Sequence, residues 1–287
     1  MRKEPITLDH LSLLSSRFAN LNVNLSEYSF ANIYLFREVH QYKLVTCHNL
    51  FITGKTRDGV FYIMPTVVPE QLDICRLRRM LKCGHCVFPI AEEWLPYFNP
   101  RHFYYTYSED DSDYLFTTNK MRTYSGRALS GRRNLVKQFL NQYAVESYAL
   151  NNERTHDAIS ALEKWALHKK IDRNDTDYAP CLEGLRLFDQ LRFTGKIYYV
   201  QKEPVAFIFG EQLNGSVYVF HFAKADTAYK GIYQYVYQDF SLGLPEGLQF
   251  INLEQDLGLS HIRRSKNAYM PDHRIKKYRV FPRKKEE

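Results

Sequence analysis

The chain has 287 residues, 45% of them hydrophobic and 25% charged, which is the composition of a soluble globular protein with room for two ordinary domains or one large one. It has no apolar run near the roughly 20 residues that a membrane span requires, and its start predicts a short amphipathic helix rather than a secretory signal. Five cysteines form no disulfide framework, so we expect a cytoplasmic protein without a transmembrane segment.

The first part of the chain alternates predicted helices and strands without long linkers. Hydrophobic periodicity, turn residues and a helix-opening proline set their limits. The polar break 109–113 is the best candidate for a domain boundary, so we expect a first domain at residues 1–113 and a second at 114–287. The predicted helices are 9–20, 70–82 and 91–98, and the predicted strands are 32–36, 43–53, 60–64 and 102–107.

The second part has a more regular order of elements. Three strands follow one another through the turns Lys202-Glu203 and Asn214-Gly215, and Asn-Gly is the strongest short signal for a hairpin. A helix, a strand, a helix and a last strand come after them, which is the order found in the GNAT-like acyltransferase fold. The predicted helices are 131–143, 152–169, 180–193, 231–242 and 257–270, and the predicted strands are 196–201, 204–212, 216–224, 248–253 and 275–281.

Two basic clusters stand on an otherwise neutral chain. Residues 263–287 hold ten basic and three acidic side chains, which accounts for the whole formal net charge of +7. The segment 120–137 carries six basic residues and no acidic one. The clusters suggest an anionic partner, such as tRNA, a phosphate-bearing cofactor or the surface of an anionic membrane, although a solvated charged face would have the same composition.

The motif Cys83-Gly-His-Cys86 is similar in spacing to a redox-active dithiol. Such a pair is activated at the start of a helix, whereas here a predicted basic helix precedes it and a short apolar run follows. Zinc would need a fourth ligand, for which Cys75 is the conceivable candidate. We therefore expect a loop with incidental cysteines and no metal site.

Several blocks from about Lys120 to the C-terminus form a recognisable set. They are Gly131-Arg-Arg-Asn134 with Phe139, the Trp165 helix, Gly231-Ile-Tyr-Gln234 with Phe240, Asn252-Leu-Glu-Gln-Asp256-Leu-Gly258, and Arg263-Arg-Ser-Lys266 with Tyr269, Pro271, Lys277 and Tyr278. Together they resemble the family built around the C-terminal catalytic domain of phosphatidylglycerol lysyltransferases. The chain departs from the family's usual residues at Leu253, in place of an arginine, and at Ala223, in place of a glutamate. The segment 28–36 is more weakly similar to the first repeat of the family.

This resemblance implies an α+β protein of two GNAT-like (acyl-CoA N-acyltransferase-type) domains in tandem, each with a mixed, mostly antiparallel sheet flanked by helices. It also implies an enzyme that transfers an aminoacyl group from charged tRNA to an amine or hydroxyl acceptor on a lipid or small molecule. Aminoacyl-tRNA would be the co-substrate, and no further cofactor is expected. The alternatives are an N-acyltransferase that uses acyl-CoA and a catalytically silent protein that binds RNA or a membrane surface.

The resemblance also names candidate site residues. An aminoacyl ester is already activated, so the protein must chiefly position it, neutralise phosphates and stabilise an oxyanion. The implied catalytic residues are Asn252, Glu254, Asp256 and Lys266. The implied substrate- and phosphate-binding residues are Arg132, Arg133, Asn134, Gly231, Gln234, Arg263, Tyr269 and Lys277.

Lys266 and Gly231 each have two interpretations. In the predicted helix 257–270, Lys266 shares a stripe with Leu259, Ile262 and Tyr269 that should be buried. It could form an ion pair with Asp256 or Glu254, or it could bind the substrate's carboxylate or phosphate. Gly231 could present backbone N–H groups to an acyl-CoA pyrophosphate, or it could simply start a helix.

Overall fold

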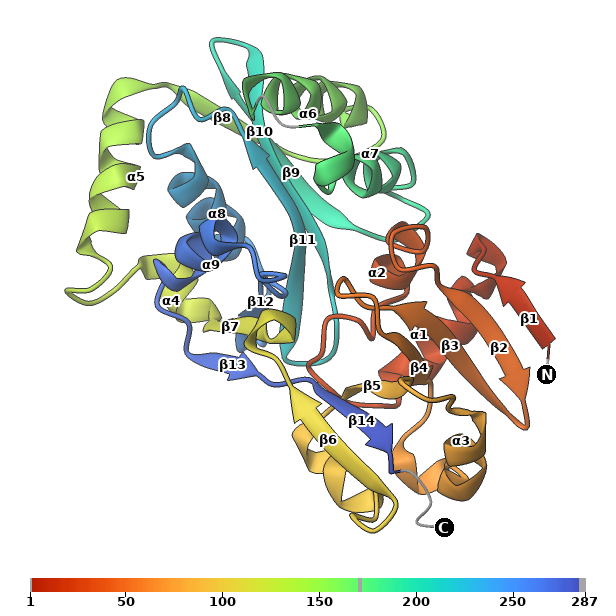
Figure 1. Ribbon diagram of the computed structural model, residues 1–287. Helices are drawn as coiled ribbons and strands as arrows, with labels where there is room; N and C mark the ends of the chain where they lie inside the picture. The colour runs from red at the N-terminus through yellow and green to blue at the C-terminus, as the bar shows by residue number, and fades with distance from the viewer. Residues whose placement is uncertain (1, 170–171, 284–287) are drawn as a thin grey trace. The chain divides into compact units, whose positions relative to one another are not determined.

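The computed structural model describes residues 2–169 and 172–283, and it divides the chain into two compact units (Figure 1). The first unit holds residues 1–113, 255–263 and 274–287, and the second holds 114–254 and 264–273. The predicted boundary at 113/114 coincides with one limit of these units. We expect all of 114–287 in the second domain, whereas 255–263 and 274–287 group with the first unit. In the second of these segments β14 (Tyr278–Pro282) pairs with two strands of the first unit, and in the other Arg263 pairs with Asp110.

The first unit is built on a seven-stranded sheet of order β1-β2-β3-β4-β5-β14-β6. Neighbouring strands are antiparallel except β4 and β5, which are parallel. The remaining strands are β1 (Arg2–Pro5), β2 (Lys43–Cys47), β3 (Asn49–Lys55), β4 (Phe61–Pro65), β5 (Cys86–Ile90) and β6 (Phe103–Tyr107). The helices are α1 (Leu11–Ala19), α2 (Phe30–Leu35) and α3 (Ile74–Met80), with 3-10 turns at Leu8–His10, Pro69–Gln71, Glu92–Tyr97 and Glu109–Asp111.

The second unit contains another seven-stranded sheet, of order β13-β7-β12-β11-β10-β9-β8. Helices α6 and α7 cover one face of this sheet, and α5 and α8 cover the other (Figure 1). The strands are β7 (Asp113–Thr117), β8 (Val145–Ala149), β9 (Thr194–Val200), β10 (Glu203–Gln212), β11 (Val217–Ala225), β12 (Phe250–Asn252) and β13 (His273–Ile275). The helices are α4 (Thr118–Thr123), α5 (Ser130–Gln142), α6 (Thr155–Lys169), α7 (Tyr178–Arg186), α8 (Ile232–Leu242) and α9 (Ser260–Asn267), with a 3-10 turn at Arg173–Asp175.

Strands β9, β10 and β11 form antiparallel hairpins at the centre of this sheet, as the turns predict. Strand β12 then pairs with β11 in parallel, over only three residues that end at Val219 and Asn252. Strand β11 continues to Ala225 beyond this pairing. The two strands are therefore paired only over these three residues and separate beyond them.

The predicted strand at 32–36 is wrong, because this segment lies in helix α2. The side chain of Ser29 caps the helix by accepting a hydrogen bond from the Asn32 amide at 3.0 Å. All six residues of α2 are buried, so no polar face gives the sequence a helical period. The stripe predicted on the last helix is also only partly buried, since Leu259, Ile262 and Lys266 are half-buried and Tyr269 alone is fully buried.

No helix in the described part of the chain is long and apolar enough to cross a membrane.

Candidate functional site

The segment after β12 turns sharply at Glu254. Glu254 has a positive φ of 59°, a conformation that non-glycine residues adopt infrequently. Its backbone N–H donates to the Asn252 side-chain oxygen at 2.6 Å, and Asn252 is fully buried. Asn252 therefore fixes the turn, and its catalytic role stays a prediction.

The Glu254 carboxylate belongs to a row of three ionisable side chains in the second unit. Its Oε1 lies 2.9 Å from His221 Nδ1, and Glu211 Oε1 lies 3.0 Å from the other ring nitrogen, Nε2. His221 and Glu254 each lie two residues beyond the last parallel pair, Val219 with Asn252, so the shared register brings them level. We call Glu211, His221 and Glu254 the Glu-His-Glu row.

A β-bulge presents His221 to its two partners. The register of β10 and β11 shifts at Phe209/Gly210, which leaves His221 as the extra residue of β11. A Cβ atom at Gly210 would lie 1.9 Å from the Val219 carbonyl oxygen, so only glycine allows the backbones to approach this closely. Such bulges commonly redirect a side chain next to a functional site.

The His221 imidazole is protonated at neutral pH. Burial opposes its charge, but hydrogen bonds to Glu211 and Glu254 and their negative charges outweigh burial and raise the His221 pKa to about 9. The His221 side chain is 1% exposed, whereas that of Glu254 is 16% exposed. Of these two side chains, Glu254 is therefore the one that a ligand can reach.

Lys266 lies on helix α9 and contacts the main chain of the same turn. Its ammonium donates to the carbonyl oxygens of Leu253 at 2.6 Å and Glu254 at 3.1 Å, and it lies 5.6 Å from the centre of the Tyr114 ring. The ion pair expected with Asp256 or Glu254 stays a prediction beside these contacts with main-chain oxygens. Lys266 fixes the backbone that carries the Glu254 side chain.

Asp256 and Arg263 form a closed ion pair in the first unit. Arg263 donates to the two carboxylate oxygens of Asp256 at 2.7 and 2.9 Å, and Asp256 also accepts from the Gly258 amide at 2.8 Å. Arg263 reaches Asp110 as well, which places a third charge on this pair. Asp256 is fully buried and has a structural role in this pair, and its catalytic role stays a prediction.

Lys277 cannot serve as the predicted phosphate contact. Its side chain is 0% exposed, and its ammonium lies 2.7 Å from the Glu27 carboxylate and 2.6 Å from that of Asp113. The side-chain oxygens of Ser26 and Gln255 accept from it at 3.4 and 3.1 Å. A lysine enclosed by these partners is a buried structural charge.

Most of the basic cluster at 120–137 is bound to main-chain oxygens. Arg122 donates to the carbonyls of Ser241 and Leu244, and Arg133 to those of Tyr124 and Gly126. Lys120 pairs with Asp272. These side chains mainly stabilise the ends of helices and loops, so the predicted phosphate contact of Arg133 is not supported. The other basic cluster runs into residues 284–287, which lie outside the described residues.

Arg132, Asn134, Gln234 and Tyr269 form the remaining predicted group. Arg132 and Asn134 lie in the first turn of α5, and Asn134 is exposed. Arg132 donates to the Ala268 carbonyl at 3.3 Å and lies 5.2 Å from the centre of the Tyr269 ring. Gln234 donates to the Tyr269 hydroxyl at 3.3 Å. The structure thus brings Arg132, Gln234 and Tyr269 together.

Gly231 has a packing role that explains its identity. It caps α8 with a φ of 93°, and a Cβ atom there would lie 2.3 Å from the Leu135 carbonyl oxygen of α5. Both constraints exclude larger residues without any bound pyrophosphate. The predicted ligand-binding role of Gly231 therefore has no support beyond its place at a helix start.

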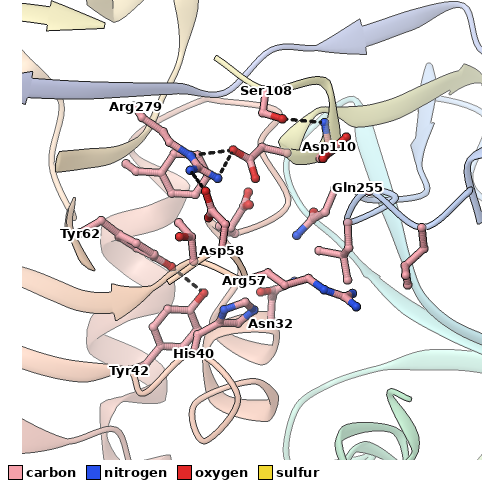
Figure 2. A pocket seen from close by; sticks show the side chains of 17 residues that line it. Asn32, His40, Tyr42, Arg57, Asp58, Tyr62, Ser108, Asp110, Gln255 and Arg279 are labelled. Carbon is pink, nitrogen blue, oxygen red and sulfur yellow. Dashed lines mark hydrogen bonds and ion pairs between the residues drawn. The ribbon is translucent and has the colours of Figure 1, made fainter. Parts of the chain in front are cut away.

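The first unit contains a polar pocket of about 420 Å³ (Figure 2). The segment Gln255 to Leu259, most of which belongs to the family block Asn252–Gly258, forms part of its wall. Tyr62 donates to the Tyr42 hydroxyl at 3.0 Å in the same pocket, and Arg279 pairs with Asp58 at 2.6 Å. The other lining residues are Glu27, Asn32, His40, Thr56, Arg57, Phe88, Ser108, Asp110 and Asp111.

The cysteine motif does not assemble a reactive pair. Cys83 is exposed, while Cys86 is buried in β5, and burial raises the Cys86 pKa to about 12. A thiol with that pKa stays protonated at neutral pH. Within residues 2–169 and 172–283, no group of three or more His, Cys, Asp or Glu side chains is placed to hold a metal ion.

Sequence reasoning missed His221, Glu211 and Glu27. One signal for His221 was available, because it is a single ionisable residue inside the apolar run Val217–Phe222. A histidine in a buried strand needs hydrogen-bonding partners, and the hairpin places Glu211 on the neighbouring strand. Glu27 had no comparable signal, since it lies in a short polar stretch between predicted elements.

Three antiparallel strands, a covering helix and a briefly paired parallel strand define the class of protein, since this is the arrangement of a GNAT-like acyltransferase domain. The chain carries two GNAT-like domains in tandem. The family model for the C-terminal region of phosphatidylglycerol lysyltransferase matches residues 18–281, and the chain belongs to this family.

Solved structures with the same fold include two that align over almost the whole chain. A conserved protein of unknown function from Bacteroides thetaiotaomicron is 22% identical, with 99% of this chain and 100% of that chain aligned and a TM-score of 0.85. L-PGS from Bacillus licheniformis is 14% identical, with 99% and 94% of the two chains aligned and a TM-score of 0.62. At these identities the likeness establishes the fold alone.

A curated relative also matches in sequence. An uncharacterized protein of Mycoplasmoides gallisepticum is 28% identical over 179 residues, which are 60% of this chain and 56% of that protein. The chain thus spans about half the length of the curated relative that it matches.

Proposed function

We propose that this protein is an acyltransferase that moves an aminoacyl group from a charged tRNA to an amine or hydroxyl acceptor on a lipid or small molecule. Membership of the phosphatidylglycerol lysyltransferase family supports the reaction class. The observation that carries the proposal is the Glu-His-Glu row, which ends in a reachable carboxylate where β11 and β12 separate.

The proposed reaction needs a proton acceptor near the acceptor substrate. The acceptor nitrogen or oxygen attacks the carbonyl carbon of the aminoacyl ester, and the Glu254 carboxylate takes the proton that this atom loses. The bond between the carbonyl carbon and the ribose oxygen of the tRNA then breaks. That oxygen takes up a proton and leaves as a hydroxyl group, so no covalent intermediate on the protein is required.

The neighbours of Glu254 act through its position. His221 holds the Glu254 carboxylate by a hydrogen bond from Nδ1, and Glu211 holds the imidazole through Nε2. Asn252 and Lys266 fix the main chain at the turn. These four are positioning residues, and Glu254 alone is proposed to contact the acceptor.

We place the tRNA phosphates at the first turn of α5, where Arg132 and Asn134 lie. A helix start favours anions, and phosphate contacts make binding sensitive to salt because they release counterions. Filter binding of charged tRNA should weaken steeply between 50 and about 300 mM salt. Binding that does not change with salt, or no binding at micromolar protein, would argue against tRNA as the donor.

A direct test is transfer from a mixture of charged tRNAs, labelled in the amino acid, to extracted lipids and small amines. New products are identified by untargeted mass spectrometry. The proposal expects a labelled product that disappears with Glu254→Gln and persists with Glu203→Gln, an exposed carboxylate outside the row. A thermal shift with acyl-CoA, together with transfer from it, would favour the acyl-CoA alternative. Failure with every donor would favour a silent binding protein.

A further inference from the structure

The pocket of the first unit carries an unbalanced buried charge at Glu27. The Lys277 ammonium contacts two carboxylates, those of Glu27 and Asp113, so these three residues together carry a net charge of −1 whenever Glu27 is ionised. All three are buried. A buried negative charge without a matching cation is costly, and a second cation beside Glu27 would offset it.

The Glu27 carboxylate has room to accept one more hydrogen bond. The Lys277 ammonium lies 2.7 Å from both of its oxygens, but its contact with Oε2 lacks hydrogen-bond geometry. Burial raises the Glu27 pKa to about 7 against the opposing effect of Lys277, which reflects the cost of this charge. Each carboxylate oxygen has two lone pairs, so the group has capacity for an N–H donor in the pocket besides Lys277.

His40 offers a second acceptor in the same pocket (Figure 2). Burial lowers the His40 pKa, so the ring is neutral, and its Nδ1 lies 2.9 Å from the Lys55 carbonyl oxygen. A carbonyl can only accept, so Nδ1 carries the proton and Nε2 is left as an acceptor. Glu27 and His40 therefore both suit the hydrogens of an ammonium group.

Arg57 supplies the opposite charge to the pocket. Its side chain is exposed, and among the described residues no carboxylate pairs with it. The nearby acids Asp58 and Asp111 are already held by Arg279, at 2.6 and 2.7 Å. Arg57 is therefore available to an anionic group of a ligand.

We propose that this pocket binds a small zwitterion, with its primary ammonium at Glu27 and His40 and its carboxylate or phosphate at Arg57. The volume of about 420 Å³ suits a ligand of amino-acid size. An apolar ligand would leave the polar groups of the lining without hydrogen bonds, and a simple anion would be repelled by Glu27. The chemistry is shared by free amino acids and by amine-bearing phosphate headgroups. The proposal stands on the pocket alone and does not rest on aminoacyl transfer.

Isothermal titration calorimetry of the full chain tests the pocket with four kinds of probe. Free amino acids and phosphoethanolamine are the two zwitterions, and their comparison distinguishes the two sources. Amino acid amides keep the ammonium without the anion, and propionate keeps an anion without the ammonium. We expect a zwitterion to bind, the amides to bind about tenfold more weakly, and propionate not to bind.

Variants locate the binding. Arg57→Ala should weaken the zwitterion about tenfold and leave the amides unchanged, while Glu27→Gln should weaken both. Exposed controls of equal charge change, Arg101→Ala and Glu38→Gln, should change neither. Glu27→Gln should still fold, because Lys277 keeps Asp113 as an ion-pair partner. If it unfolds, Arg57→Ala still tests the proposal, because Arg57 is exposed. Absence of zwitterion binding at millimolar concentration, or equal binding by Arg57→Ala, would overturn the proposal.

Discussion

Replacing Lys266 with methionine should destabilise the protein through two main-chain oxygens. Methionine keeps an apolar stem but removes the ammonium that contacts the Leu253 and Glu254 carbonyls at 2.6 and 3.1 Å. Hydrogen bonds from a charged donor contribute about 1.5–3 kcal/mol each, and Lys266 is half-buried, which favours the lower end of that range. We therefore expect a loss of about 2–4 kcal/mol.

Urea unfolding followed by circular dichroism measures this loss as a lower midpoint at an unchanged slope. Lys164→Met is the matched control, because Lys164 forms only an exposed ion pair with Glu203 at 2.7 Å. Its loss should cost under about 1 kcal/mol. The double variant Lys266→Met with Glu254→Gln should show no rescue, since it leaves the Leu253 and Glu254 carbonyl oxygens without their donor. A midpoint equal to wild type, or a full rescue in the double variant, would refute the contacts described for Lys266.

Further predictions concern charge and backbone packing. The His221 pKa of about 9 exceeds the ordinary 6.5, so the protonated ring stabilises the fold fully below pH 6.5, and this stabilisation is lost as pH rises towards 9. Between pH 6.5 and 9, the free energy of unfolding of the wild type should therefore fall by about 3 kcal/mol more than that of His221→Gln, as measured by urea unfolding. The Glu27 pKa of about 7 exceeds the ordinary 4.5, so stability should fall from pH 4.5 to 7, and Glu27→Gln should flatten that fall; an unchanged slope would contradict it. Gly210→Ala should cost more than about 3 kcal/mol because its Cβ would meet the Val219 carbonyl at 1.9 Å, whereas Gly215→Ala, with open space around it, should have little effect; equal midpoints would exclude the bulge geometry.

The central strands of the second unit could be predicted from local signals. Alternating side chains and the Asn214-Gly215 turn predict β10 and β11 to within a residue or two, because hairpins are specified by neighbouring residues. The helix α2 could not be predicted, since a short, fully buried segment shows no period. The return of β14 to the first sheet depends on contacts between distant parts of the chain, which local pattern does not contain.

In the candidate site, too, local motifs predict some residues, while others depend on contacts between distant parts of the chain. Glu254 follows from its family block, and in the structure its side chain is 16% exposed at the turn after β12. The contact between His221 and Glu254 depends on the parallel register of β11 and β12, which no short motif specifies. Lys277 is predicted to contact phosphate because its neighbours in the sequence are basic. In the fold, the carboxylates of Glu27 and Asp113, which are distant in the sequence, enclose it instead.

The most direct test of the central claim is the rate of aminoacyl transfer by Glu254→Gln, measured beside His221→Gln with the acceptor identified by mass spectrometry. A proton acceptor typically contributes about 10²–10⁴-fold, so Glu254→Gln should lose at least about 100-fold in kcat while still binding charged tRNA. The His221 variant should lose less, because it positions the carboxylate without contacting the substrate. Transfer by Glu254→Gln at the wild-type rate would contradict the account.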